Sequence, residues 1–172
     1  IWLTLVAFFL YLIRRRPRDL NDGAMLSPAD GTINAVEHVD QHEAVDGPAV
    51  IIRIFLSVFN VHINRSPCDA TVQNLVYRPG AFHDARTEKS ACLNESNLLW
   101  LQRASGEMIG VRQVSGAVAR RIVCDVKKGT SLKRGERFGM IKFGSTTELI
   151  LPRPYDASIH VKKGDRVKAG LT

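Results

Sequence analysis

Two hydrophobic patterns divide the chain into a short uniform segment and a long interrupted one. Residues 1–13, IWLTLVAFFLYLI, carry no charge and would be apolar on every side of a helix. Such a helix spans about 20 Å at ~1.5 Å per residue, less than the about 30 Å of a bilayer core. From Asn21 onward, β-branched and aromatic runs such as Val50–Phe59 alternate with glycines. This second pattern predicts short strands separated by tight turns.

Basic residues follow the apolar segment at once: Arg14, Arg15, Arg16 and Arg18. Positive residues concentrate at the cytoplasmic end of membrane helices. Because the sequence also starts at Ile1 rather than Met, we expect residues 1–18 to be the C-terminal part of a transmembrane anchor with its basic flank. Residues 19–172 are then predicted to lie on the cytoplasmic side of the inner membrane. An ordinary buried helix is the alternative for the apolar segment.

An internal repeat refines the prediction of a mainly β fold. Val126–Gly135 and Val161–Gly170 both read V-K-K-G-x-x-hydrophobic-K-x-G. Strand, glycine turn, short strand and glycine turn form the hairpin unit of lipoyl- and biotinyl-type folds. We therefore expect a barrel-sandwich-hybrid-like domain with few short helices, one of them around residues 116–123. A swinging-arm carrier has a lysine at a hairpin tip, flanked by acidic residues or methionine. Neither copy has such a lysine, so a carrier domain is disfavoured.

Composition and charge indicate the kind of partner. The 24 basic and 17 acidic side chains give a net charge of +7, which favours an anionic partner of some kind. The basic residues are spread over many turns rather than clustered with stacking aromatics, so nucleic acid is not expected as a partner. Cys68, Cys92 and Cys124 have no zinc-ligand spacing, and we predict reduced thiols and no metal site.

Three short segments contain residues suited to nucleophilic or acid–base chemistry. The turn SPADGT contains Asp30, the strand end FNVHINRSP contains His62, and FGSTTEL contains the pair Gly144 and Ser145. Each has an ordinary structural interpretation when taken alone. A fourth segment, Pro79–Asn94, is polar and is predicted to be a long exposed loop, a kind of loop that is often functional.

In combination and in this order, the motifs SPADGTI, FLSVFNVHINRSP, VRQVSGAVARRIV and FGSTTELILP closely resemble the short, membrane-associated phosphatidylserine decarboxylases of bacteria and archaea. The resemblance covers most of the chain. It implies a pyruvoyl-dependent carboxy-lyase that converts phosphatidylserine to phosphatidylethanolamine and CO2 through a Schiff base. It further implies self-cleavage at the Gly144–Ser145 bond. The products would be a β subunit, residues 1–144, and an α subunit, residues 145–172, whose pyruvoyl group derives from Ser145.

The same resemblance implies roles for the catalytic residues. A serine hydroxyl needs a base within hydrogen-bond reach, and a carboxylate can fix the tautomer of a histidine base. We therefore expect His62 to deprotonate Ser145 and Asp30 to orient His62. Gly144 offers an unhindered carbonyl and unusual backbone angles. His62 is also the candidate that returns a proton to the substrate after CO2 leaves.

One departure from the family pattern affects substrate binding. Many longer members have a second histidine at the position of Arg65 in this chain. A guanidinium suits lipid phosphate or carboxylate, although a structural salt bridge is an equal alternative. Asn64 and His83 are further tentative substrate-binding residues, and His83 is the second candidate for acid–base work.

Two questions stay open at this level. A non-catalytic, membrane-tethered β-domain that binds anionic lipid or protein partners explains the charge and the repeat, but not the combination of Asp, His and Gly-Ser motifs. The archaeal lipid archaetidylserine is an alternative substrate. A homodimer is expected from the family alone.

Overall fold

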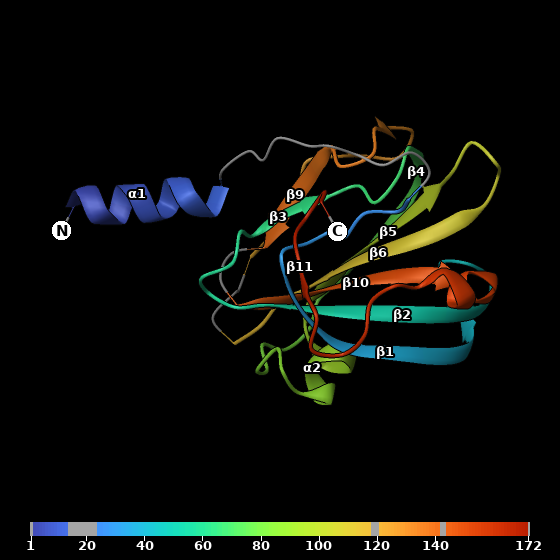
Figure 1. The fold of residues 1–172 in the computed structure, drawn as a ribbon, viewed down its shortest axis with the longest axis horizontal. Coiled ribbons are helices and arrows are strands. Elements are labelled where there is room, and N and C mark those ends of the chain that lie inside the picture. The colour runs from blue at the N-terminus through green and yellow to red at the C-terminus, as the bar shows by residue number, and fades with distance from the viewer. Residues whose placement is uncertain (1, 14–23, 118–120, 142–143, 172) are drawn as a thin grey trace.

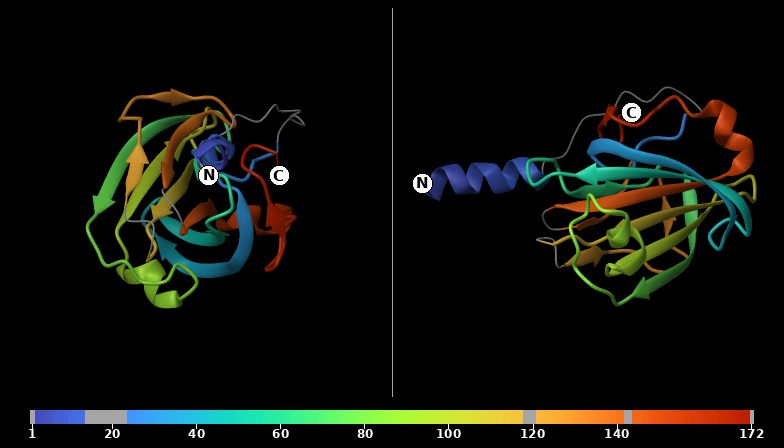
Figure 2. Two further views of the ribbon diagram at one scale, coloured as in Figure 1. Left: turned by 90° about the vertical axis from the view of Figure 1, so that its left-hand side faces the viewer. Right: turned by 90° about the horizontal axis from the view of Figure 1, so that it is seen from below.

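The computed structural model describes residues 2–13, 24–117, 121–141 and 144–171 (Figure 1). Helix α1 (Trp2–Ile13) projects from one end of a β domain, as Figures 1 and 2 show. None of the helices in the described residues is long and apolar enough to cross a membrane. The four arginines of the predicted basic flank lie outside the described residues, so the anchor stays a prediction.

The domain is built on one curled antiparallel sheet, which Figure 2 shows from its end. Its strand order is β11-β1-β2-β10-β6-β5-β4-β8. The strands are β11 (Arg166–Val167), β1 (Gly31–His42), β2 (Gly47–Leu56), β10 (Ser145–Pro152), β6 (Met108–Val114), β5 (Ser96–Gln102), β4 (Ala70–Arg78) and β8 (Ser131–Leu132). The predicted mainly β fold is confirmed.

A small second sheet and two short helices complete the domain. The sheet has the order β3-β9-β7, with β3 (Ile63–Arg65), β9 (Arg137–Ile141) and β7 (Ile122–Cys124). The helices are α2 (Glu88–Leu93) and the 3-10 helix η1 (Arg153–Ser158). The helix expected around residues 116–123 is wrong where the structure describes it, because β-branched Ile122 and Val123 pair with β9 instead.

Both faces of the central strands are buried, which explains why their sequences read as continuous apolar runs. Ala49–Ile54 in β2 is buried at every position. Ile52 and Ile54 join the main core inside the curl, whereas Ile51 joins a smaller cluster on the outer face. This double burial stabilises the middle of the sheet, where β2, β10 and β6 lie side by side.

The two V-K-K-G copies occupy equivalent places. The Gly129 N–H donates to the Val72 carbonyl and the Gly164 N–H to the Ile33 carbonyl, both at 2.8 Å. The short strand after each glycine then pairs with the start of a long strand, β8 with β4 and β11 with β1. The predicted hairpin repeat is therefore a structural unit used twice.

The segments at the starts of β1 and β4, with which these hairpins pair, also repeat in sequence. SPADGTI at residues 27–33 matches SPCDATV at residues 66–72. The Leu26 N–H donates to the Pro67 carbonyl and the Arg65 N–H to the Pro28 carbonyl, both at 2.9 Å. These reciprocal bonds join the two copies, giving the fold an approximate two-fold relation.

Candidate active site

The predicted cleavage pair lies where β10 begins. Ser145 is the first residue of the strand, is fully buried and pairs with Leu56 of β2. Its Oγ has no hydrogen-bond partner among the described residues. An unpaired buried hydroxyl costs about 1–3 kcal/mol, so this is an unusual state for a core serine. The orphan hydroxyl makes Ser145 the first candidate for a reactive group.

Gly144 has a backbone conformation that favours glycine. Its φ is +68°, in the left-handed region where a side chain is strained. Its carbonyl oxygen packs against Gly116, where an added Cβ would lie only 2.1 Å from that oxygen. Two glycines thus enclose the bond predicted to break. Gly116 lies in the motif VRQVSGAVARRIV, but the sequence assigned it no role.

His62 lies beside this bond, just before β3. Its Nε2 accepts the Gly144 N–H at 3.1 Å, so the Nε2 lone pair points into the site. Burial lowers the pKa of His62, and a backbone hydrogen bond involving Asn60 partly opposes that shift. The imidazole is therefore neutral at neutral pH, the form that a general base requires. The structure brings together three predicted catalytic positions, His62, Gly144 and Ser145.

Asn64 and Arg65 are buried and engaged with the protein. The Asn64 Nδ2 donates to Thr147 Oγ1, and its Oδ1 accepts from Gln113 Nε2, both at 2.9 Å. The Arg65 Nη1 donates to the Gly135 carbonyl at 3.0 Å. The two Asn64 contacts hold β3 against β10 and β6, where His62 reaches the cleavage pair. Gln113 is a residue that sequence reasoning missed, and substrate contacts of Asn64 and Arg65 stay predictions.

Asp30 is also buried and takes part in the repeat. Its Oδ1 accepts the Ala169 N–H at 2.9 Å. Asp69, at the matching position of the second copy, accepts the Arg134 N–H at 2.6 Å. Asp30 therefore caps a turn of the fold as Asp69 does. That it also orients His62 stays a prediction.

The segment Pro79–Asn94 is more ordered than the predicted exposed loop. It contains α2, and Ala85, Ser90 and Asn94 are buried. The Ala85 carbonyl accepts from Thr146 Oγ1 at 3.1 Å, so the segment covers the outer face of β10 beside Ser145. The exposed-loop prediction is wrong for these residues, because their small and amide side chains pack against strand ends.

His83 lies on the exposed part of this segment. Its backbone N–H donates to Asn94 Oδ1 at 2.8 Å. The Asn94 Nδ2 donates to the carbonyls of His83 and Ser115, both at 2.9 Å. The backbone of His83 is thus tied to the strand end beside the cleavage pair, while its imidazole is exposed. Its proposed contact with substrate stays a prediction. Phe143 of the FGST motif lies outside the described residues.

Comparison with known proteins places this site in a family. A family model described as phosphatidylserine decarboxylase matches residues 5–172. The chain is similar to the phosphatidylserine decarboxylase proenzyme of Magnetococcus marinus, with 39% identity over 99% of this chain and 82% of that protein.

Two further relatives have the same name. The proenzyme of Desulfotalea psychrophila is 41% identical over 100% of this chain and 80% of its own length. The proenzyme of Ralstonia nicotianae is 44% identical over 99% of this chain and 79% of its own length. The matched segments include His62, Gly144 and Ser145. The chain belongs to the phosphatidylserine decarboxylase family.

Proposed function

We propose that this chain is a decarboxylase proenzyme that cleaves itself at Gly144–Ser145 and converts phosphatidylserine to phosphatidylethanolamine and CO2. The observation that carries the proposal is the cleavage pair itself. Ser145 has a buried, unpaired hydroxyl next to a left-handed Gly144, and the Gly144 N–H is bonded to His62 Nε2. The relatives that match nearly the whole chain are named as proenzymes of this activity.

The first chemical step is an acyl shift within the chain. The Ser145 Oγ attacks the Gly144 carbonyl carbon, a C–O bond forms, and the C–N bond to Ser145 breaks. The hydroxyl proton passes to His62 Nε2 and then to the departing Ser145 nitrogen. β-Elimination of the resulting ester removes the Ser145 α-proton, breaks the Cβ–O bond and frees the Gly144 carboxylate, leaving a Cα=Cβ double bond at residue 145. Addition of water with loss of ammonia then leaves a pyruvoyl group there.

The surroundings of Ser145 fit such a group. A pyruvoyl carbonyl supplies an electron sink for the amine of a serine headgroup, comparable to other carbonyl cofactors. Residue 145 is fully buried. Because Gly116 has no side chain, the adjacent Gly144 carbonyl is not displaced. His62 Nε2 would hold the proton that the substrate α-carbon takes up after CO2 leaves. Burial lowers the pKa of His62, so its protonated form, once made, is a stronger acid and gives up that proton more readily.

The loop between β2 and β3 supports a site that faces a bilayer. Phe59 is 70% exposed and Val58 is 37% exposed. Val58 lies 3.8 Å from the position of a Cβ built at Gly144, so an apolar surface adjoins the cleavage bond. Figures 1 and 2 show this loop at the end of the domain nearest α1, whose Trp2 and Leu3 are also exposed. Aromatic and aliphatic side chains at such an edge suit a lipid interface.

Intact-mass measurement of the purified chain tests the proposal. We expect two polypeptides, residues 1–144 and 145–172, with a hydrazine-reactive carbonyl on the smaller one and CO2 release from phosphatidylserine vesicles. The Ser145→Ala chain should stay whole and inactive. A wild-type chain that folds, remains uncut and releases no CO2 would overturn the proposal and favour a non-catalytic lipid-binding domain.

A further inference from the structure

A second buried serine lies level with Ser145 on the neighbouring strand. Ser115 directly follows β6, and Val114 pairs with Thr146 of β10. The close approach of Gly116 to the Gly144 carbonyl shows that the two chains stay side by side beyond that pair. The antiparallel register therefore places Ser115 directly opposite Ser145.

Both hydroxyls face the same side of the sheet. Directly opposite residues of antiparallel strands point to the same face, and so do residues two apart in one strand. Gln113 and Thr147, two positions away from Ser115 and Ser145, both bond Asn64 of β3. Ser115 and Ser145 therefore also face β3, on the side from which His62 reaches Gly144.

Neither hydroxyl has another partner within the described part of the chain. Both serines are fully buried, and both Oγ atoms lack a hydrogen bond. Opposite residues in a sheet have Cβ atoms about 4.5–5.5 Å apart. Rotation about χ1 is enough to bring two serine oxygens at that separation to a hydrogen bond of about 2.8 Å. Each serine hydroxyl can therefore serve as the hydrogen-bond partner of the other.

We propose that Ser115 is a positioning residue for self-cleavage, an inference that rests on the proposed function. The Ser115 O–H donates to Ser145 Oγ and thereby holds the Ser145 side chain in one rotamer. The Ser145 O–H then replaces the Gly144 N–H as the donor to the single lone pair of His62 Nε2, and a lone pair of Ser145 Oγ is directed to the Gly144 carbonyl carbon. Ser115 neither gains nor loses a proton, and the bonds that form and break are those of the acyl shift.

A cell-free synthesis time course of the full chain tests this role, with precursor and products separated by gel and by mass. Ser115→Ala should slow self-cleavage by about 10- to 100-fold, the range expected from misplacing a reacting group. Its midpoint in the pH profile of cleavage should match wild type, because the base is unchanged. Its melting temperature, measured in a Ser145→Ala background, should not fall, since the hydroxyl removed is unpaired there.

Ser96→Ala is the matched control. Ser96 is equally buried and pairs with Val114, but it faces the outer side of the sheet together with Thr146. This variant should cleave at the wild-type rate. If the melting temperature of Ser115→Ala falls, loss of packing could also slow cleavage. Ser115→Cys separates the two effects, because its thiol fills the space of the hydroxyl but is a weaker hydrogen-bond donor. Slow cleavage at wild-type melting then supports the role, and wild-type cleavage overturns it.

The outcomes separate this inference from the proposed function. A wild-type chain that never cleaves overturns both. A wild-type chain that cleaves, together with a Ser115→Ala chain that cleaves equally fast, overturns only the role of Ser115. A shifted pH midpoint in Ser115→Ala would also contradict it, because that result would make Ser115 part of the proton-accepting group.

Discussion

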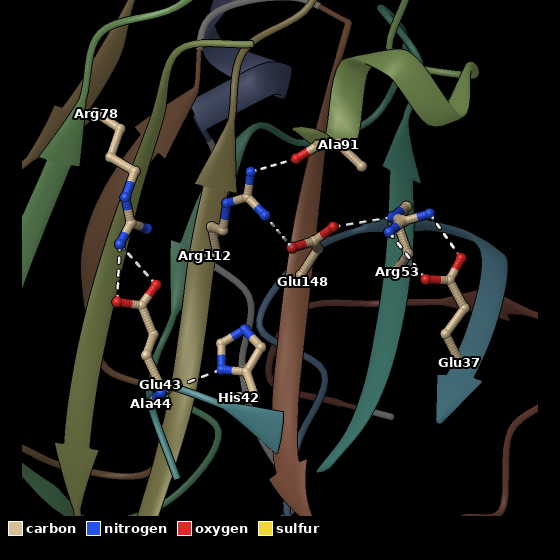
Figure 3. A network of polar contacts seen from close by, with 9 residues as sticks. All are labelled: Glu37, His42, Glu43, Ala44, Arg53, Arg78, Ala91, Arg112 and Glu148. Carbon is tan, nitrogen blue, oxygen red and sulfur yellow. Dashed lines mark hydrogen bonds and ion pairs between the residues drawn. The ribbon is translucent and has the colours of Figure 1, made fainter. Parts of the chain in front are cut away.

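Two buried polar side chains of β10, Glu148 on one face and Ser145 on the other, differ in whether they have a hydrogen-bond partner. On the outer face, Glu148 is almost fully buried, and both carboxylate oxygens are paired (Figure 3). One accepts from Arg53 Nε at 2.9 Å and the other from Arg112 Nη1 at 3.1 Å. On the inner face, three residues earlier, the Ser145 hydroxyl has no partner among the residues described.

The difference separates a structural role from a reactive one. A buried carboxylate is stable only when it is paired, and the arginine pair meets that need. Figure 3 also shows Arg112 donating to the Ala91 carbonyl of α2 and Arg53 bonding Glu37. The outer network thus ties four strands, β1, β2, β10 and β6, and the helix α2 together. Because this network holds the outer face rigid, the inner face can keep the Ser145 hydroxyl without a hydrogen bond near the neutral His62.

The largest expected effect falls on the inner face. His62→Gln retains an acceptor for the Gly144 N–H but removes the base. We expect self-cleavage to slow by about 10²- to 10⁴-fold, while the melting temperature changes little. The same time course of precursor and products measures it. Cleavage at the wild-type rate would show that another residue accepts the Ser145 proton.

The second effect falls on the outer face and concerns stability. Glu148→Gln removes the carboxylate between the buried Arg53 and the partly buried Arg112, and we expect a loss of about 3–5 kcal/mol in the free energy of unfolding. Urea unfolding in a Ser145→Ala background measures it on an uncut chain. Glu37→Gln is the control, because Glu37 is 42% exposed and should cost less than about 1 kcal/mol. Equal losses from both variants would contradict this account of the network.

A smaller effect is expected between the two strands that flank the cleavage bond. Gly116→Ala places a Cβ 2.1 Å from the Gly144 carbonyl oxygen, so that the backbone must shift. We expect cleavage to slow by about tenfold or more, because small displacements of reacting groups are costly. Gly47→Ala, with no atom within 4 Å of the added Cβ, should leave the rate unchanged. An unchanged rate in Gly116→Ala would mean that this contact does not set the geometry.

The smallest effect is the response to pH near neutrality. Burial lowers the pKa of His62 below the ordinary histidine value of about 6.5, so the neutral imidazole predominates from pH 8 to pH 7. The cleavage rate should change by less than about twofold over that range. It should then fall in acid with a midpoint below 6.5, since protonation removes the base. A midpoint above 6.5 would show that His62 is not the group that titrates.

Much of the fold was predictable from local patterns. β-Branched runs between glycines predict short strands, and the repeated V-K-K-G hairpins depend only on residue spacing. The same local reasoning failed for Ile122–Cys124, where partners in β9 stabilise a strand. It also failed for the segment around Ala85 and Asn94, which is buried by contacts with β10 and Ser115. Contacts distant in sequence override local preference.

The sequence by itself determined the mainly β class and the hairpin repeat, because each depends on residue types close together in the chain. The residue pair at which cleavage is predicted came from the resemblance of the motifs to a family, not from local residue types. Only the tertiary structure decided that His62 Nε2 meets the N–H of Gly144, 82 positions away. It also decided that Ser115 lies opposite Ser145. Strand order and register bring such residues together, and a pattern of apolar positions specifies which face a side chain takes but not which strand lies beside it.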